Sequence, residues 1–286
     1  MKSWIFLFAA LCLTSCVTLN PLRQKLTLDD ATHDRCVEIL RKGIQDPEHW
    51  PAIHAAEGLT LGGYGGEVLA YFDSKNWDHL DDQQKCGVAR ERVRAGHKEA
   101  AQVMIEILEG DDPFGHTHAA ESLYKVGIIG DCVYMRKRFE DERGDIKLRL
   151  MAAAALAKKG DREAFVFLRD SMQSDDEDTY RIAAWILGRV GGKRDIALLK
   201  SRLGDSDDPV VEAYLNNSLA ALGDAEGLAA LEANLGADDP ALRTYAATFA
   251  GDARAYHLAP KLQQLLDDPH LDARYRAAQS LLYLSR

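Results

Sequence analysis

The sequence predicts an all-α protein, a right-handed α-solenoid of about eight helical hairpins. One observation is a pair of small or apolar residues that returns along the chain, followed by a Leu and a Gly. A second is a turn built from Asp and Pro that recurs between these pairs. The second members of successive pairs are 33, 31, 33, 31, 33, 30 and 31 residues apart, a period typical of stacked helical hairpins. The pairs are Ala55-Ala56, Val88-Ala89, Ala119-Ala120, Ala152-Ala153, Ala183-Ala184, Asn216-Asn217, Ala246-Ala247 and Ala277-Ala278.

Residues 1–15 form an export signal in this interpretation and lie outside the fold. Lys2 supplies a positive start, and the apolar run over residues 4–13 is shorter than the roughly twenty residues that a spanning helix needs. The run ends in Leu13-Thr14-Ser15-Cys16, which resembles the lipobox of bacterial lipoproteins. The resemblance implies lipidation of Cys16, and several acyl chains together anchor a protein firmly. An ordinary cleaved signal is the alternative.

The segment after the cysteine is expected to be a tether. Val17 and Thr18 follow Cys16 with no Asp as a retention signal, so the resemblance implies the outer membrane of a bacterial cell envelope. Residues 16–28 show no helical period around Pro21 and are predicted to link the lipid to a solenoid over residues 29–286. Which side of the membrane the solenoid occupies stays open.

The first and last helices of the solenoid are predicted over residues 29–44 and 271–284. The first should begin near Asp29 and turn Cys36, Val37 and Leu40 inward. The last ends two residues before the chain does and carries apolar side chains with no polar repeat after them. Terminal repeats usually need such a polar cap for solubility. Leu281, Leu282 and Leu284 should therefore either face the preceding repeat or form a docking surface.

Residues 191–222 show how one repeat is built. Ile196, Leu199 and Leu203 have helical spacing, which predicts a helix over residues 195–203 that Gly204 ends. Asp208 can cap the next helix with its carboxylate, and Pro209 suits the first helical position because its missing N–H needs no partner there. The same turn recurs at Asp112-Pro113, Asp239-Pro240 and Asp268-Pro269.

These features resemble HEAT repeats, in the short form found in PBS-lyase-type proteins. The features are the Asp-Pro turns, an Arg a few residues later as at Arg243 and Arg274, the Ala-Ala helix and the Gly stop. The resemblance covers residues 29–286 and implies an architecture without implying an activity. Some HEAT-like enzymes, the deoxyhypusine hydroxylases, hold two irons with adjacent His-Glu pairs. This chain contains no adjacent His-Glu pair, so that activity does not carry over.

Composition narrows the classes of partner. The formal net charge of −10 disfavours nucleic acid and anionic lipid headgroups as partners. Beyond Cys16 the chain has only Cys36, Cys86 and Cys132, an odd number that does not make a disulfide framework. They are expected to be small buried groups, although a single bridge stays open.

The candidate site lies in the N-terminal repeats. His54 and Glu57 share one helix face, and His118 and Glu121 repeat that relation two units later. The simplest interpretation is a structural ladder in which Arg90, in the unit between, bridges both glutamates. A ligand-binding groove and a metal site are the alternatives. Equivalent positions two units apart should be on the order of 20 Å apart, too far to share one ion.

The predicted function is binding rather than catalysis. We expect a membrane-anchored scaffold or adaptor that holds a protein or an extended ligand on its concave face, with no cofactor and no metal. The alternative is a metal-dependent enzyme or binder that uses His and Glu of the N-terminal repeats. Trp50 belongs to an aromatic cluster that should seal the first repeat, and part of it could line one end of the concave face. The groove is predicted from Trp50, His54, Glu57, Arg90, His118 and Glu121.

Overall fold

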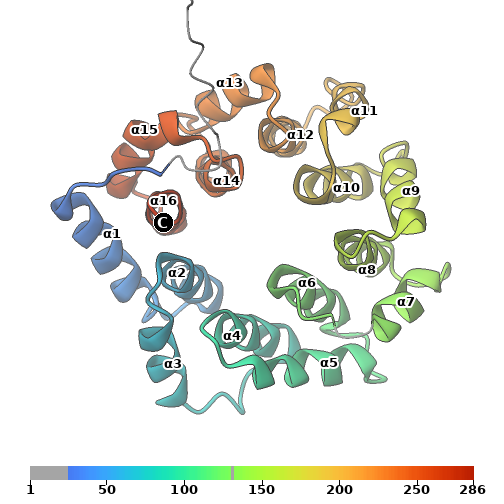
Figure 1. Ribbon diagram of the computed structural model, residues 1–286, viewed down its shortest axis with the longest axis horizontal. Helices are drawn as coiled ribbons and strands as arrows, with labels where there is room; N and C mark the ends of the chain where they lie inside the picture. The colour runs from blue at the N-terminus through green and yellow to red at the C-terminus, as the bar shows by residue number, and fades with distance from the viewer. Residues whose placement is uncertain (1–24, 130–131) are drawn as a thin grey trace, which may run out of the picture.

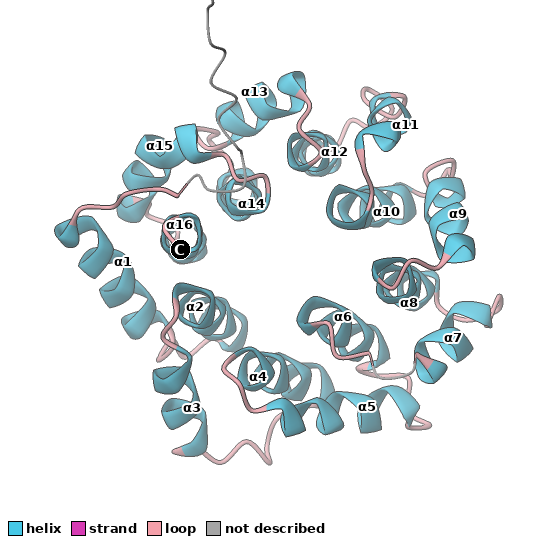
Figure 2. Ribbon diagram, viewed as in Figure 1, coloured by secondary structure: helices cyan, strands magenta, loops and turns pink. Residues whose placement is uncertain are grey.

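The computed structural model describes residues 25–129 and 132–286. The predicted signal peptide, the predicted lipidation site at Cys16 and most of the predicted tether lie outside these residues. The described ranges contain α-helices and short 3-10 turns and no β-strand (Figure 2). Within them, no helix combines the length and the apolar character needed to cross a membrane. The prediction of an all-α solenoid is confirmed.

The helices alternate between an inner and an outer layer, as eight consecutive hairpins (Figure 1). The outer helices are α1 (Asp30–Gly43), α3 (Gly65–Asp73), α5 (Ala101–Glu109), α7 (Val133–Glu140), α9 (Arg162–Ser171), α11 (Ile196–Lys200), α13 (Ala225–Asn234) and α15 (Ala259–Gln264). The inner helices are α2 (His49–Gly62), α4 (Asp82–Arg94), α6 (His116–Val126), α8 (Ile146–Lys158), α10 (Glu177–Val190), α12 (Pro209–Ala221), α14 (Pro240–Asp252) and α16 (Leu271–Leu284).

Local sequence sets where these helices begin. Asp29 caps α1 by accepting the backbone N–H of Thr32, and α16 spans the predicted residues. At two of the four Asp-Pro turns, Asp208 and Asp239 cap α12 and α14 as predicted. At the other two, Asp112 and Asp268 accept a backbone N–H two residues on, and the helix starts later. These turns order the chain ahead of the helix instead of capping it.

The recurring small residues lie where neighbouring helices approach closely. Apart from the half-buried Asn216, the paired residues are all buried. The contact between α10 and α12 shows the reason, because a Cβ on Gly188 would lie 2.9 Å from the Cβ of Ser218. Larger side chains at such positions would push the repeats apart, since protein interiors are close-packed. The cysteines in the described ranges are free thiols. Cys36 and Cys86 are buried as expected, whereas Cys132 is only half-buried.

The solenoid closes on itself, a feature that the sequence period does not predict. The last helix, α16, packs against α2 and α1 as well as against α14, so the hairpins form a ring (Figure 1). One hydrophobic cluster includes Leu40 and Leu59 from the first repeat together with Leu281 and Leu282 from the last.

Polar contacts reinforce the closure. The backbone N–H of Leu26 donates to the carbonyl of Leu284 at 2.9 Å, and the guanidinium of Arg286 donates to the carbonyl of Leu61 at 2.8 Å. The expectation that the apolar end either faces the preceding repeat or docks a partner was therefore incomplete. Leu282 meets the first repeat, and the first and last repeats cap each other.

Candidate functional site

The closed ring brings His54 and Glu57 of α2 against the last repeat. His54 Nδ1 lies 2.7 Å from a carboxylate oxygen of Asp272 in α16. Glu57 accepts from Arg276 of α16 at 2.8 Å and from Arg94 of α4 at 2.6 Å. The partners of both residues therefore include side chains more than two hundred positions away in the sequence. No local pattern indicates them, because they depend on ring closure.

Burial and charge set the protonation of these groups. Burial raises the pKa of Glu57, but the charges of Arg94 and Arg276 outweigh it and hold the pKa well below its usual range. The pKa of His54 is lowered, mainly by burial and then by Arg276, although Asp272 acts in the opposite direction. In the tautomer that carries its proton on Nδ1, His54 donates this hydrogen bond to Asp272. Glu57 and His54 are thus engaged in holding the ring together.

The predicted ladder through Arg90 does not form by direct ion pairs, although the charges of Glu57 and Glu121 both act on Arg90 and raise its pKa. Arg90 Nε donates to the neighbouring Glu91 at 2.8 Å, and its side chain makes no ion pair with Glu57 or Glu121 among the described residues. Glu91 is fully buried and also accepts from Arg94 at 2.8 Å. Sequence reasoning missed Glu91 and Arg94. The available signal was the spacing of Arg90 and Arg94, four residues apart and therefore on one helix face.

Trp50 and His118 meet although they lie two hairpins apart. Their rings stack with centroids 5.5 Å apart and an interplanar angle of 27°. Gly87 of the intervening helix makes room, because a Cβ there would lie 3.3 Å from Cζ3 of Trp50. The two repeats were expected to lie too far apart for such a contact. The indole of Trp50 reaches His118 because the residue between them, Gly87, has no side chain.

Glu121 pairs with Lys125 one turn later, at 2.6 Å. Burial raises the pKa of Glu121, but the charge and hydrogen bond of Lys125 outweigh it and lower that pKa. Burial also lowers the pKa of Lys125, against the opposing effect of Glu121. Within the described ranges, no three His, Cys, Asp or Glu side chains lie together as a metal site would require.

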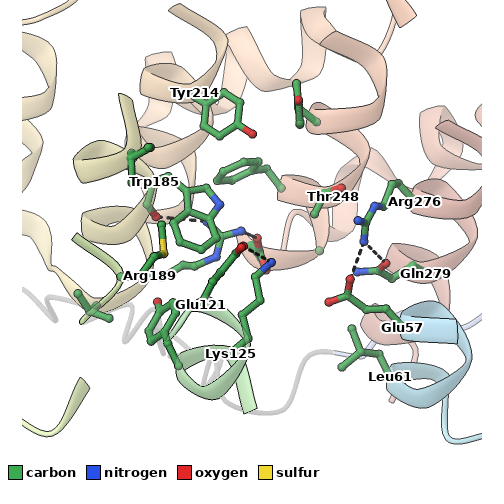
Figure 3. Close-up of a pocket in the computed structure, with 18 of the residues that line it drawn as sticks. Glu57, Leu61, Glu121, Lys125, Trp185, Arg189, Tyr214, Thr248, Arg276 and Gln279 are labelled. Atoms are coloured by element: carbon green, nitrogen blue, oxygen red, sulfur yellow. Dashed lines mark hydrogen bonds and ion pairs between the residues drawn. The ribbon is translucent and has the colours of Figure 1, made fainter. Parts of the chain in front are cut away.

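The lumen of the ring contains a cavity of about 840 Å³ (Figure 3). Every lining residue belongs to one of the inner helices, and each of the eight inner helices contributes. Glu57 and Glu121 line this cavity, whereas Trp50, His54, Arg90 and His118 do not. The candidate site is therefore larger than the predicted groove and lies mostly in repeats that the sequence analysis did not select.

The lining of the cavity is positively charged and rich in aromatic side chains. Three carboxylates line it, from Glu57, Glu121 and Asp252, against seven cations. The cations are Arg94, Lys125, Lys147, Lys158, Arg181, Arg189 and Arg276. The aromatic residues are Tyr124, Trp185, Tyr214, Tyr245, Phe249 and Tyr283. An acidic protein thus encloses a cationic lumen.

Six of the seven cations are paired with carboxylates. Arg94, Arg276 and Lys125 have the partners described above, and Arg189 pairs with Asp252. Asp178 pairs with both Lys147, at 2.9 Å, and Arg181, at 2.6 Å. Hydrogen bonds from these two cations lower the pKa of the Asp178 carboxyl to about 2. This network fixes the positions of the cations around the lumen.

Lys158 differs from the other cations. Its ammonium donates to the backbone carbonyl of Tyr124 at 3.1 Å, and no carboxylate of the described residues pairs with it. Burial of part of the side chain lowers the pKa of Lys158, and the charges of Arg94 and Lys159 add to that effect. Lys158 is otherwise exposed at the cavity and available to an anion.

Comparison with known proteins supports HEAT-like repeats in part of this ring. Residues 136–216, from α7 to α12, match the HEAT repeats family. The matched residues make up less than a third of the chain. No curated protein matches the sequence.

Solved structures resemble the chain only distantly. Human deoxyhypusine hydroxylase in complex with glycerol is 18% identical with a TM-score of 0.40, over 88% of this chain and 97% of that one. An engineered protein is 16% identical with a TM-score of 0.28, over 87% of this chain and 96% of that one.

Proposed function

We propose that this helical-repeat protein is a non-catalytic scaffold of the bacterial cell envelope that binds a partner protein through an extended segment held in the lumen. The observation that carries the proposal is the cavity to which all eight inner helices contribute. Its volume of about 840 Å³ is in the range of ligand pockets and far below that of a folded domain. A protein partner can therefore enter only as an extended segment.

The binding role, rather than a catalytic one, is supported by how the acidic groups of the lumen are used. Glu57, Glu121 and Asp252 are each paired with a cation. Ion pairs of this kind stabilise the carboxylate, which makes it a poor general base. The lumen then presents fixed charges and aromatic faces to a ligand.

The membrane anchor remains part of the proposal. It rests on the resemblance of residues 13–16 to a lipobox, with Cys16 as the lipidated residue. The tether would join the ring where Leu26 is bonded to Leu284, at the closure. In this arrangement the lipid holds the scaffold at the membrane while the lumen stays free to receive a segment.

Capture from membranes tests the proposal. The lipidated protein is compared with Thr248→Trp, which places a bulky neutral side chain in the lumen, and with Glu163→Trp on the exposed side of α9 as the control. We expect one partner to be captured by the wild type and by the control, and lost by Thr248→Trp with the helical circular dichroism unchanged. Equal capture by all three places the partner outside the lumen. Absence of any captured protein contradicts the scaffold role.

A further inference from the structure

The charge of the lumen is opposite in sign to that of the whole protein. The chain carries a formal net charge of −10, yet the cavity is lined by seven cations and three carboxylates. Two further carboxylates that do not line the cavity, Glu91 and Asp178, pair with cations of the lining, and a positive surplus remains. Concave surfaces with low-dielectric walls concentrate such a field. The lumen therefore attracts anions in a protein whose exterior repels them.

One cation is free to meet an anion directly. Lys158 is the last residue of α8, so the helix C-terminus and its bond to the Tyr124 carbonyl account for its position. The bond to Tyr124 uses one of the three N–H groups of the Lys158 ammonium, so the other two remain for an anion. The nearby charge of Arg94 disfavours the charged form of Lys158, and a bound carboxylate would relieve that repulsion.

Two aromatic rings lie between Lys158 and two further cations. Lys158 Nζ is 5.2 Å from the centre of the Tyr124 ring, and the Tyr124 and Trp185 rings are 6.1 Å apart. Arg189 and Lys125 lie 4.3 and 5.5 Å from the centre of the Trp185 ring. Figure 3 shows Trp185, Arg189 and Lys125 grouped in the cavity. We call Lys158, Tyr124, Trp185, Arg189 and Lys125 the lumen cluster.

We infer that the lumen cluster recognises an acidic polypeptide segment, with a carboxylate on Lys158 and a neighbouring aromatic side chain against Trp185. The inference rests on the proposed function, because it names the chemistry of the segment that the ring would hold. A polypeptide fits better than a lone inorganic anion, since the cations are spread over α6, α8 and α10 with aromatic faces between them. An extended segment in which acidic and aromatic side chains alternate would place carboxylates near these cations and rings near these aromatic faces.

Peptide titration with the full chain tests this inference. The probes are end-blocked hexapeptides of alternating Glu and Tyr, of Gln and Tyr, and of Lys and Tyr, measured by calorimetry at low salt. We expect the Glu-Tyr peptide to bind about tenfold more tightly than the Gln-Tyr peptide, because a charge-assisted hydrogen bond is lost in the latter. The Lys-Tyr peptide should bind most weakly, and added salt should lower the affinity for the Glu-Tyr peptide.

Substitutions of Lys158 test whether the Glu-Tyr peptide binds at the lumen cluster. Lys158→Gln should lower the affinity for the Glu-Tyr peptide about tenfold, and Lys158→Arg should keep most of the wild-type affinity. Neither substitution should shift the thermal unfolding transition much. Lys159→Gln is the matched control, because Lys159 is the adjacent exposed lysine and does not line the cavity. An equal loss with Lys159→Gln would show a diffuse charge effect and overturn the inference.

The outcomes separate the inference from the proposed function. Equal binding of the Glu-Tyr and Gln-Tyr peptides overturns the acidic specificity while leaving a lumen that holds extended segments. Binding of inorganic phosphate that depends on Lys158, without binding of any peptide, overturns the polypeptide assignment in favour of a small anion. The capture experiment with Thr248→Trp decides the scaffold role independently of both results.

Discussion

Asn217 occupies a position at which the other seven repeats carry alanine. Its side chain is fully buried, and neither its amide nitrogen nor its oxygen has a hydrogen-bond partner within the described ranges. A buried polar group without a partner costs about 1–3 kcal/mol relative to water. The residue therefore weakens the repeat in which it lies.

Replacing Asn217 with alanine should stabilise the protein. We expect Asn217→Ala to raise the free energy of unfolding by about 1 kcal/mol, because the desolvation cost is removed and the small cavity left behind offsets only part of it. Chemical denaturation measures the change. Asn216→Ala is the control, since Asn216 donates to the carbonyl of Glu212 at 3.0 Å and its loss should lower stability. A loss of stability in Asn217→Ala would contradict this account.

His54 predicts a dependence of stability on pH. Its pKa in the folded protein is lowered, mainly by burial, so the unfolded chain binds this proton more readily. Stability contributed by neutral His54 is therefore present above the unfolded pKa of about 6.5 and falls as the pH drops below it. His54→Gln removes the titrating group, so its stability should fall less than that of the wild type between about pH 7 and pH 5. Identical slopes in the two proteins would contradict the assignment.

At the scale of single helices, two glycines with similar sequence settings have opposite roles. A Cβ on Gly227 of α13 would lie 2.6 Å from the Cβ of Leu219 and 2.7 Å from the backbone nitrogen of Ala220, both in α12. A Cβ on Gly66 of α3 would meet no atom within 4 Å. Gly227 thus lets two helices touch, whereas Gly66 only lowers the helix propensity of α3.

Alanine substitutions should separate the two cases. We expect Gly227→Ala to destabilise the protein by about 2 kcal/mol, because backbone atoms of α12 cannot yield without moving the helix. Gly66→Ala should be stabilising by about 0.5 kcal/mol. Thermal denaturation of both variants measures the difference, and a change of the same sign in both would refute the close-approach argument.

The helices could be predicted from the sequence because their determinants are local. The start of α1 follows from its cap at Asp29, and the extent of α16 follows from apolar spacing within about fifteen residues; the structure has both helices nearly as predicted. The site could not be predicted as well. The sequence places His54 and Glu57 on one helix, but their partners Asp272 and Arg276 come from the last helix of the chain.

At the scale of the whole molecule, closure depends on a small rotation between repeats that accumulates around the ring. No single repeat encodes it, so the sequence period gives the stacking without the final shape. Closure turns the expected open concave face into an enclosed lumen and removes the exposed C-terminal face. Leu282, 1% exposed, illustrates the consequence, because its burial depends on α2 of the first repeat.

A disulfide between the first and last repeats tests the closure of the ring. A Cβ on Gly62 would lie 3.4 Å from the Cβ of Leu282, close to the separation of about 3.8 Å found in disulfides. The double variant Gly62→Cys/Leu282→Cys is oxidised in dilute solution and analysed by non-reducing gel and by mass spectrometry of the linked peptides. The control pair is Gly62→Cys/Glu163→Cys, because α9 lies across the ring from α2 (Figure 1).

If the ring is closed, an intramolecular bond forms between residues 62 and 282 in the folded monomer, the oxidised protein migrates faster on the gel, and the control pair forms no bond. A folded double variant whose two thiols stay reduced, or that links only between molecules, would show that the solenoid is open. The enclosed lumen, and the binding role built on it, would then be contradicted.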